Sequence, residues 1–342
     1  MEKNHLIDGK NFSPNKLSIK RKINVGIVGS GKIAEEYIRI IKSFNHYVSV
    51  VVSPSKNLNI KKFKYLTSFE FEKTYFKFKN IDIWIVCTKW SSLKKYLHFF
   101  LKEKKPVLIE KSIIIKSSKI KKICQSKKID VSNIKIAYNR NFYDYLPPLI
   151  KKIKNKKLHF IEANIFDPYT RIQKKNGKKI RPFLSYFISS HWVALILKII
   201  ELSNIKIEKI DKKIIKKDIQ GNSISLDFNL KQKGSKFILR YNHLPNKPLN
   251  HSIKFFFENE IVELSPIETI KTHEKLDFIN KGNSNIYKPS IVVRNVDAKF
   301  KPGFRSLYYN FVMTSIFAKK SKFLTNLKDL SKIYEICELI KK

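Results

Sequence analysis

Residues 23–37 read INVGIVGSGKIAEEY, and this stretch decides the fold. It contains Gly26, Gly29 and Gly31, three of only nine glycines in the chain. The apolar residues before Gly29 predict a short buried strand, and those between 33 and 41 recur at the spacing of an amphipathic helix. A strand, a glycine-rich turn and a helix are therefore expected to follow one another here.

The turn itself, residues 29–34, has the sequence GSGKIA, the G-x-G-x-x-A form of the dinucleotide-binding fingerprint. The first glycine of such a turn permits a tight bend, the second lets the backbone approach a pyrophosphate, and the small third residue lets the helix pack close to the strand. Unpaired amides at the helix N-terminus attract phosphate. We expect Gly29, Gly31, Lys32 and Ile33 to bind a dinucleotide; the alternative is a strand, turn and helix without a ligand.

The composition is that of a globular protein with room for two cores. The chain has 342 residues, of which 43% are hydrophobic and 13% aromatic. It has no apolar run long enough to suggest a membrane span and no apolar N-terminal leader. Cys87, Cys124 and Cys337 lie far apart without the spacing of metal ligands. We expect them to be thiols in a reducing cytoplasm, and we expect no metal.

The formal net charge of +42 raises the possibility of a nucleic-acid partner. However, almost all the cations are lysines spread over every segment, whereas base-edge and bidentate phosphate recognition favours arginine. We interpret the charge mainly as solvated lysine and expect neither nucleic acid nor membrane as a partner.

Strands and helices alternate in the first half of the chain. Apolar strands are predicted at 48–52, 81–87, 106–109 and 134–138, and helices at 93–102 and 119–126. Near-continuous apolar strands separated by helices indicate a doubly wound parallel sheet that is covered on both faces. The ligand of such a sheet binds at the carboxyl ends of its strands.

Strand character dominates after residue 138. Strands are predicted at 158–166, 205–210, 223–230, 236–241 and 253–264, and helices at 185–202, 307–318 and 327–340. Strands joined by short turns indicate a largely antiparallel open sheet, and 266–302 is interpreted as loop. We therefore expect a polar extension over 1–21, a Rossmann domain over 22–138 and a C-terminal α/β domain over 139–342.

Four motifs occur in a recognisable order: the fingerprint at Gly29, a strand ending VCT at 86–88, LIEKS at 108–112 and AYNRNF at 137–142. In this order and spacing the chain resembles the glucose-fructose oxidoreductase/inositol dehydrogenase (Gfo/Idh/MocA) family, from residue 23 almost to the C-terminus. The resemblance implies nicotinamide-dependent oxidation or reduction of a sugar-like substrate. It also implies a homo-oligomer formed through the open sheet of the C-terminal domain.

Lys111 is the first catalytic candidate, because it is similar in context to the lysine of the family's Glu-Lys-Pro motif. A lysine at the carboxyl edge of the sheet can hydrogen-bond the reacting hydroxyl, and partial burial lowers its pKa toward a useful value. The alternative is one more surface lysine. Glu110 is assigned to the cofactor site, and Ser112 stands where the family has proline.

His191 is the second catalytic candidate. It matches the histidine of the family's Asp-x-x-x-His-x-x-Asp helix, but Phe187 and Ala194 replace the two acids. An imidazole without a carboxylate partner is less firmly oriented and less basic, so acid–base work falls mainly to Lys111. The alternative is a histidine whose ring is satisfied on an apolar helix face.

Three further positions resemble parts of the family's cleft. Thr88 begins the segment that corresponds to the family's Thr-Pro-Asn, and it is assigned to the cofactor site; Trp90 stacks by the cofactor or fills the core. Asn139 and Arg140 resemble the segment that lines the substrate cleft. Arg140 is expected to bind a substrate anion or to form a structural salt bridge.

The end of the second strand bears on the choice of cofactor. A carboxylate that would bind the adenosine ribose is missing, and the chain reads VSPSK over 52–56. Ser53 and Lys56, a hydroxyl and a cation, suit a 2′-phosphate better, so NADP is favoured over NAD. The alternative is a plain Ser-Pro turn.

These observations predict a cytoplasmic NAD(P)-dependent oxidoreductase that transfers hydride between the nicotinamide and a sugar or nucleotide-sugar hydroxyl or carbonyl. Lys111 is the expected proton-transfer group, and His191 assists. The main alternative is a catalytically degenerate family member that binds a dinucleotide or sugar and acts as a regulator. The acids missing at 187 and 194 would explain that alternative.

Overall fold

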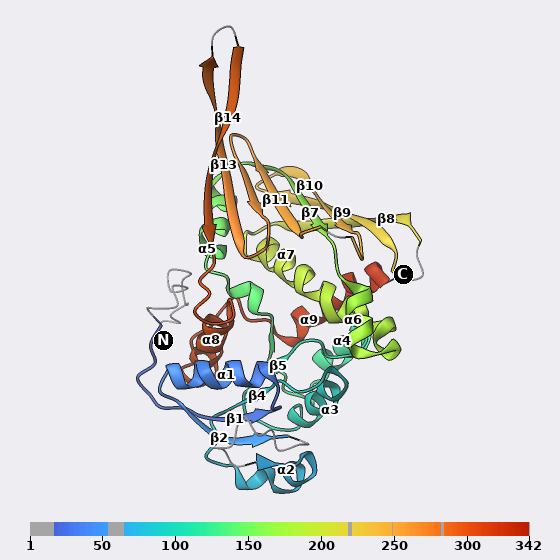
Figure 1. Cartoon of the computed structure of the whole chain (residues 1–342). Helices are drawn as coiled ribbons and strands as arrows, with labels where there is room; N and C mark the ends of the chain where they lie inside the picture. Colours follow the sequence, from blue (N-terminus) through green and yellow to red (C-terminus); the bar gives the residue numbers. More distant parts are fainter. Residues whose placement is uncertain (1–16, 54–64, 218–220, 248, 282–283, 342) are drawn as a thin grey trace. The chain divides into compact units, whose positions relative to one another are not determined.

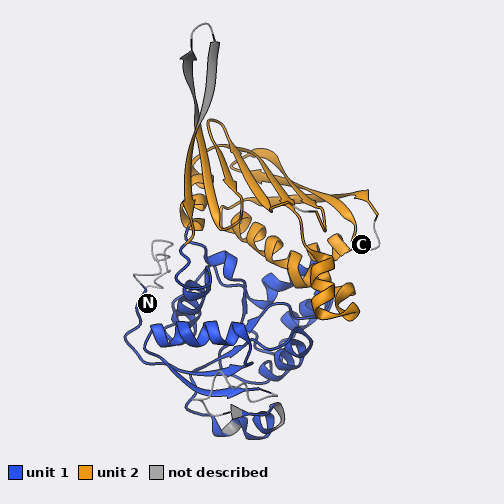
Figure 2. Ribbon diagram, in the orientation of Figure 1, with its two compact units in different colours: residues 1–144, 297–335 blue, residues 145–296, 336–342 orange. Residues whose placement is uncertain are grey.

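Two β-sheets organise the chain, one in each of two units (Figures 1 and 2). The computed structural model describes residues 17–53, 65–217, 221–247, 249–281 and 284–341. Unit 1 comprises Met1–Asp144 and Asp297–Glu335, and unit 2 comprises Tyr145–Val296 and Ile336–Lys342.

The sheet of unit 1 has six parallel strands in the order β3-β2-β1-β4-β5-β6. The strands are β1 (Asn24–Val28), β2 (Tyr47–Val52), β3 (Tyr65–Leu66), β4 (Ile83–Val86), β5 (Val107–Glu110) and β6 (Ile134–Ala137). Every residue of β4 and β5 is buried, which means that both faces of the sheet are covered. The predicted doubly wound parallel sheet is confirmed.

The helices of this part of unit 1 follow the strands in alternation. They are α1 (Lys32–Ser43), α2 (Ser68–Thr74), the 3-10 turn η4 (Tyr75–Lys77), α3 (Trp90–Phe100), α4 (Ser117–Gln125) and the 3-10 turn η5 (Asn139–Phe142). α1 buries Ala34, Tyr37 and Ile41 on one face, as the helical spacing after the fingerprint predicts.

Gly26, inside β1, is required by its neighbour on β4. A Cβ atom at this position would lie 2.3–2.7 Å from ring atoms of Trp84, whose side chain is fully buried. The indole therefore fills the space that a side chain at 26 would need. The same test at Gly31 finds no atom within 4 Å, and its backbone is extended.

We expect Gly26→Ala to lower the free energy of unfolding by about 1–3 kcal/mol, the usual cost of overpacking a core. Gly31→Ala is the matched control and should stay within about 0.5 kcal/mol of wild type, as surface changes do. Urea denaturation measures both. Equal stability of the two variants would show that Trp84 does not set the requirement for glycine at 26.

The chain returns to unit 1 near its C-terminus, with α8 (Phe304–Ile316) and much of α9 (Leu327–Lys341). The predicted second domain includes 297–335, but these residues belong to unit 1, with the Rossmann sheet. The reason is the apolar face of α8, where the rings of Phe304 and Tyr37 lie 5.2 Å apart. Tyr308 of α8 also lies 2.7 Å from Nδ1 of buried His46.

The burial of His46 predicts that the stability of the protein depends on pH. Burial lowers the pKa of His46 from 6.5 to about 4. The unfolded chain therefore binds a proton at a higher pH than the folded chain, and stability falls as the pH falls from about 6.5 toward 4. We expect His46→Asn to flatten this part of the stability–pH curve. An unchanged slope in chemical denaturation across this range would contradict the assignment.

Unit 2 is built on an eight-stranded sheet in the order β14-β13-β12-β11-β7-β10-β9-β8. Its strands are β7 (Leu158–Ile165), β8 (Lys206–Lys216), β9 (Ser223–Gln232), β10 (Ser235–His243), β11 (Ser252–Phe257), β12 (Ile261–Leu264), β13 (Thr269–Lys281) and β14 (Ser284–Asn295). β7 and β10 pair in parallel, and the other described pairs are antiparallel. The predicted, largely antiparallel sheet is confirmed.

The helices of unit 2 include α5 (Leu146–Asn155), α6 (Tyr169–Asn176), the 3-10 turn η6 (Lys178–Phe183) and α7 (Ser190–Leu202). One turn of π-helix, η7 (Ser185–Ser189), leads into α7, where the sequence predicts a single helix over 185–202. Within the described residues, 185–202 is the one helix long and apolar enough to cross a membrane, and most of it is buried in the unit. It is therefore a core helix of unit 2.

Two predictions in this half differ from the structure. The stretch 253–264 forms two strands, β11 and β12, because residues 258–260 turn the chain between them. The stretch 266–302, interpreted as loop, contains the hairpin of β13 and β14. Residues 271–275 of β13 contain no apolar side chain and β14 contains Pro289, so the apolar alternation that reveals a half-buried strand is weak.

Candidate functional site

The fingerprint turn lies at the carboxyl ends of the central strands of unit 1. Gly29 has φ +125°, and a Cβ atom there would lie 2.5 Å from the Cys87 carbonyl oxygen, so glycine is needed. Its amide donates to the Val52 carbonyl at 2.8 Å, and the Cys87 amide donates to Val28 at 2.8 Å. The turn is therefore held between β2 and β4.

Gly31 is the N-cap of α1, and no side chain of the described residues caps this helix. Open space lies where its side chain would be. Lys32 is exposed and Ile33 half-buried in the first helical turn, whose amides have no intrahelical acceptor. The four residues predicted to bind the dinucleotide are thus brought together around a helix N-terminus suited to phosphate.

Ser53, at the end of β2, lies beside this turn. Its hydroxyl oxygen is 2.6 Å from that of Ser30, and the residue is buried. The structure thus places Ser53 beside the fingerprint turn, and the predicted preference for NADP over NAD depends on this position. Lys56, the second residue of that argument, lies outside the described residues.

Glu110 ends β5 as a buried carboxyl group. The Tyr37 hydroxyl of α1 donates to Glu110 Oε1 at 2.8 Å. Burial raises the pKa of Glu110, while the bond from Tyr37 and the charges of Lys111 and Lys301 act in the opposite direction. Burial and the charge of Glu110 also raise the pKa of the Cys87 thiol, which makes this cysteine a poor nucleophile.

Lys301 joins this group although sequence reasoning missed it. It lies in 297–303, the segment that enters α8, and its charge acts on Glu110. Its backbone amide donates to Glu36 Oε1 of α1 at 2.6 Å. No sequence signal distinguishes it from the many other lysines.

Lys111 and Thr88 are both half-buried; Lys111 directly follows β5, and Thr88 lies two residues after the end of β4. The Lys111–Ser112 peptide bond is cis. Trp90 is the first residue of α3 and is half-buried. The carboxyl edge of the sheet therefore carries the glycine turn, Ser53, Thr88, Glu110 and Lys111, as predicted for a doubly wound sheet.

Asn139 and Arg140 follow β6 in the 3-10 turn η5. The buried Asn139 amide donates to the Pro302 carbonyl at 2.9 Å, so it anchors the segment before α8. Arg140 is half-buried. This bond gives Asn139 a structural role that the sequence did not indicate, and a substrate contact for either residue stays a prediction.

His191 belongs to unit 2, whereas Lys111 belongs to unit 1. It is half-buried in the first turn of α7, just after the π-helical turn. Phe187 is half-buried and Ala194 is buried, and neither residue is an acid.

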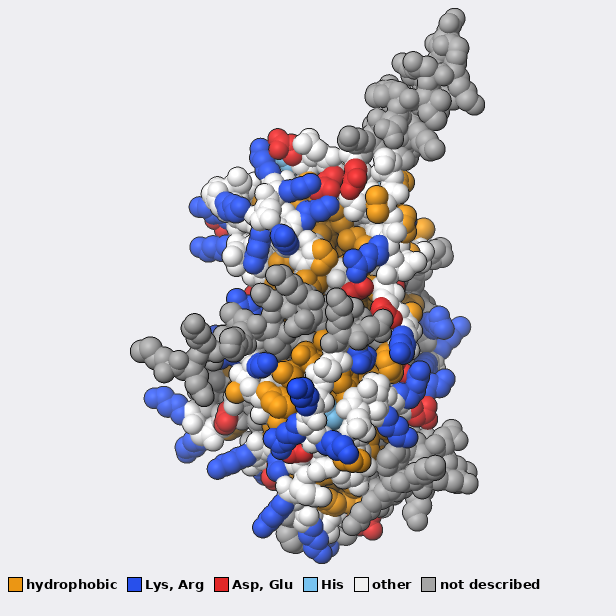
Figure 3. All heavy atoms as spheres, turned by 90° about the vertical axis from the view of Figure 1, so that its left-hand side faces the viewer, with side chains coloured by type: hydrophobic (Ala, Val, Ile, Leu, Met, Phe, Trp, Pro, Cys, Tyr) orange, Lys and Arg blue, Asp and Glu red, His pale blue; other side chains and the backbone are white. Residues whose placement is uncertain are grey.

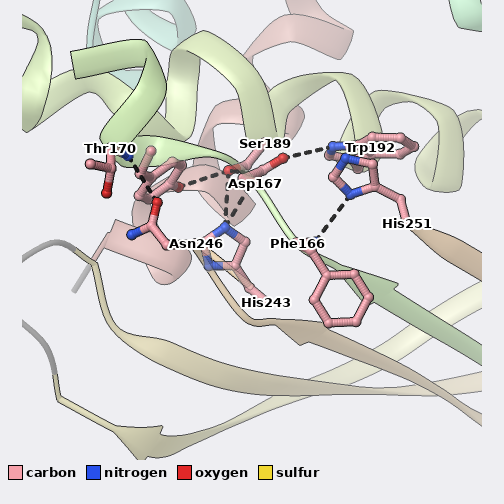
Figure 4. Close-up of polar contacts among 9 residues, drawn as sticks. Phe166, Asp167, Thr170, Ser189, Trp192, His243, Asn246 and His251 are labelled. Carbon is pink, nitrogen blue, oxygen red and sulfur yellow. Dashed lines mark hydrogen bonds and ion pairs between the residues drawn. The ribbon is translucent and has the colours of Figure 1, made fainter. Parts of the chain in front are cut away.

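A carboxylate is nevertheless buried near this turn (Figure 4). Asp167, which follows β7, is completely buried. Its Oδ2 accepts from the Ser189 hydroxyl at 2.6 Å and lies 3.2 Å from His243 Nε2, and its Oδ1 accepts from the Trp192 indole at 2.9 Å. Burial alone would raise the pKa of Asp167, but the bonds and charge of His243 and the bond from Ser189 hold it below its usual value.

No sequence pattern selects Asp167. Its donors come from β10 and from either side of His191, so only the folded chain brings them together. Ser, His and Asp also form hydrolase triads, but here Ser189 donates directly to Asp167, and all three residues are buried. In a hydrolase triad the histidine lies between the aspartate and the serine and takes the proton of the serine, so the arrangement here is a different one.

Comparison with protein families agrees with the geometry of unit 1. Residues 23–130 match the model of the Gfo/Idh/MocA oxidoreductase family, NAD-binding Rossmann fold. No curated protein sequence matches the chain.

Solved structures extend the likeness in fold to both units. A dehydrogenase from Chromobacterium violaceum has a TM-score of 0.72 at 11% identity, covering 94% of this chain and 95% of that one. The transcriptional regulator Gal80p from Kluyveromyces lactis has a TM-score of 0.67 at 13% identity, covering 94% and 89%. UDP-N-acetylglucosamine 3-dehydrogenase GnnA from Acidithiobacillus ferrooxidans has a TM-score of 0.64 at 10% identity, covering 94% and 97%.

The fold of the chain is therefore shared by dehydrogenases and by a regulator. Together with the ordered motifs and the glycine turn, the family match shows that this chain carries the NAD-binding Rossmann domain of the Gfo/Idh/MocA oxidoreductase family.

Proposed function

We propose that the protein is a cytoplasmic NAD(P)-dependent oxidoreductase that acts on a hydroxyl or carbonyl group of a sugar or nucleotide sugar. The observation that carries the proposal is the open space over Gly31 at the uncapped start of α1, on the same sheet edge as half-buried Lys111. Dehydrogenases of similar fold, one of them acting on a nucleotide sugar, support the substrate class.

The residues of the turn fit a dinucleotide. Gly29 and Gly31 leave the backbone open to a pyrophosphate, and the first amides of α1, at Lys32 and Ile33, would hold it. Thr88 follows β4, the strand next to β1, and Glu110 ends β5, the next strand beyond it. When bound, the nicotinamide supplies the hydride acceptor or donor.

The chain's own contribution is proton transfer. Lys111 would hydrogen-bond the substrate hydroxyl, taking its proton in oxidation and returning it in reduction. The buried carboxyl group of Glu110 next to it places a negative charge by the ammonium group when ionised. His191 would assist, and Arg140 would bind an anionic part of the substrate, such as a phosphate.

A regulatory family member is the second candidate. Phe187 and Ala194 stand where the family carries acids, and Gal80p shows that a regulator can have this fold. Such a protein would bind the cofactor without turnover. A nucleic-acid-binding protein is less well supported, because the lysines and arginines on the face shown in Figure 3 are scattered over both units rather than gathered in one stripe.

The cofactor preference rests on Ser53, which lies beside the fingerprint. We expect NADPH to bind more tightly than NADH, and Ser53→Asp to reverse the order, because a carboxylate repels a 2′-phosphate and accepts bonds from ribose hydroxyls. Ser53→Ala is the control for loss of the bond to Ser30. Calorimetric titration measures the affinity of each of the three proteins for NADPH and for NADH. If Ser53→Asp leaves the order of the two affinities unchanged, contact of residue 53 with the adenosine ribose is excluded.

The catalytic prediction separates the enzyme from the regulator. Lys111→Ala should lower kcat by about 10²- to 10⁴-fold, the usual contribution of a general acid or base, with little change in cofactor affinity. His191→Ala should cost less, because no acid stands at 187 or 194 to raise the basicity of the imidazole. Absorbance assays over a panel of sugars and nucleotide sugars measure turnover. A wild-type protein that binds NADPH but turns over nothing would favour the regulator.

The homo-oligomer is proposed through the face of the unit 2 sheet that points away from its core. From β9 to β13, one cross-strand row on that face alternates in charge: Asp227, Arg240, Glu162, Lys254, Glu263 and Lys271. The alternation stops at β8, where Asp211 pairs with Asp227. The next row contains Ile238, Phe160, Phe256 and Ile261, and Ile238 is 37% exposed. A hollow of about 650 Å³ opens beside Phe256 and Ile261.

The charge order favours one symmetry. The row reverses sign when it is read from the other end, so its midpoint lies between Glu162 and Lys254. A two-fold axis parallel to the strands at that midpoint places each acid over a base of the second copy, whereas an axis along the row places like over like.

We therefore expect Lys254→Glu to shift the protein toward monomer, and the charge swap Glu162→Lys with Lys254→Glu to restore association. Lys151→Glu, an exposed change on α5, is a control with the same net charge. Sedimentation velocity over a concentration series gives the oligomeric state. A monomeric wild type, or equal effects of the two single reversals at 254 and 151, would rule out this interface.

A further inference from the structure

The strongest unexplained feature outside the Rossmann turn is the buried carboxylate of Asp167. Burying an ionised group is costly unless it is paired and hydrogen-bonded. Asp167 has three side-chain partners, Ser189, Trp192 and His243. Burial and full pairing mean that this charge cannot touch a substrate directly, so any effect on function must pass through the groups that it holds.

Two of those partners flank His191 in the sequence. Ser189 ends the π-helical turn and is the N-cap of α7, and Trp192 is the residue after His191. Both donate to the same carboxylate, one to each oxygen. The turn of backbone that carries His191 is therefore held at both ends by a single group.

The surroundings make this anchor rigid. The Tyr169 hydroxyl lies 2.8 Å from the Ser189 hydroxyl oxygen, and the Asp167 carbonyl accepts from the amides of Tyr169 and Asn246 at 2.9 and 3.0 Å. On the other side, the Trp192 ring lies against the His251 ring, with centroids 4.1 Å apart and the ring planes tilted by 37°. Figure 4 shows Ser189, Trp192 and His243 pointing to Asp167 from η7, α7 and β10.

The position of the anchor is informative because it coincides with a change of helical register. A π-helical turn is an irregularity that occurs often at functional sites. Here it ends at Ser189, two residues before His191. The contact at Ser189 fixes the point at which the π-helical turn passes into α7.

We propose that Asp167 is a positioning residue for His191, which it orients through Ser189 and Trp192. This inference rests on the proposed function, in which His191 assists proton transfer. Phe187 and Ala194 provide no carboxylate that could orient the imidazole of His191. Asp167 provides one, and it acts through the backbone turn that carries His191 rather than by a bond to the ring.

Three variants test the anchor. Asp167→Asn keeps the shape but removes the charge, and it leaves only one side-chain oxygen to accept hydrogen bonds. Trp192→Phe and Ser189→Ala each remove one donor, which keeps the test informative if Asp167→Asn fails to fold. The matched control is Tyr145→Phe, because the buried Tyr145 hydroxyl also makes one bond in unit 2, to the Ile267 carbonyl at 3.0 Å, on elements other than α7.

The first readout needs no turnover. In protein labelled at histidine, we expect the ring resonances of His191 to shift or broaden in Asp167→Asn, Trp192→Phe and Ser189→Ala, and to stay unchanged in Tyr145→Phe. His191→Ala identifies the signal. Unchanged His191 resonances in all three folded variants would overturn the proposal, whether or not the protein is an enzyme.

The second readout separates positioning from a general loss of stability. Each anchor variant should lower kcat by up to about 10²-fold, the cost of a small misplacement of a reacting group, and by no more than His191→Ala. Adding Trp192→Phe to His191→Ala should cause no further loss, because both changes act through one imidazole. Additive losses would overturn the proposal. A wild type without turnover would count against the proposed function, and the resonance test would still decide the role of Asp167.

Discussion

The close approach of Gly29 to the end of β4 is the constraint on which unit 1 depends. The backbone at Gly29 adopts φ +125° and leaves no room for a side chain against the Cys87 carbonyl. This contact lets β1 turn directly into α1, so that the helix N-terminus opens at the carboxyl edge of the sheet. The positions of Ser53 and Thr88 beside the turn follow from the strand order.

Sequence patterns predicted the parallel sheet well because its strands are apolar throughout and separated by helices. They fail where polar residues interrupt the apolar period, as in β13 and β14, which the sequence predicts as loop. They also missed the return of α8 to unit 1, since the contacts of Phe304 with Tyr37 and of Tyr308 with His46 join residues far apart in the chain.

The candidate site divides in the same way. The glycine fingerprint is a local signal, so Gly29 and Gly31 could be selected from the sequence, and Lys111 could be selected from its resemblance to the family's Glu-Lys-Pro motif. The partners that define their surroundings could not: Tyr37 reaches Glu110 from a helix, and Asp167 collects donors from separate elements. A buried charge is identified by its three-dimensional partners, and a sequence shows only that an aspartate is present.

The central claim is that the turn at Gly29 to Ala34 binds a dinucleotide, and Gly31→Val tests it most directly. The extended backbone and the open space at Gly31 allow valine without disturbing the fold, while the side chain would occupy the place of the pyrophosphate. Calorimetric titration of NADPH and NADH into both proteins is the measurement. We expect the wild type to bind the dinucleotides and a Gly31→Val variant of unchanged thermal stability to bind neither. Equal affinity in the two proteins would show that the turn is not the dinucleotide site.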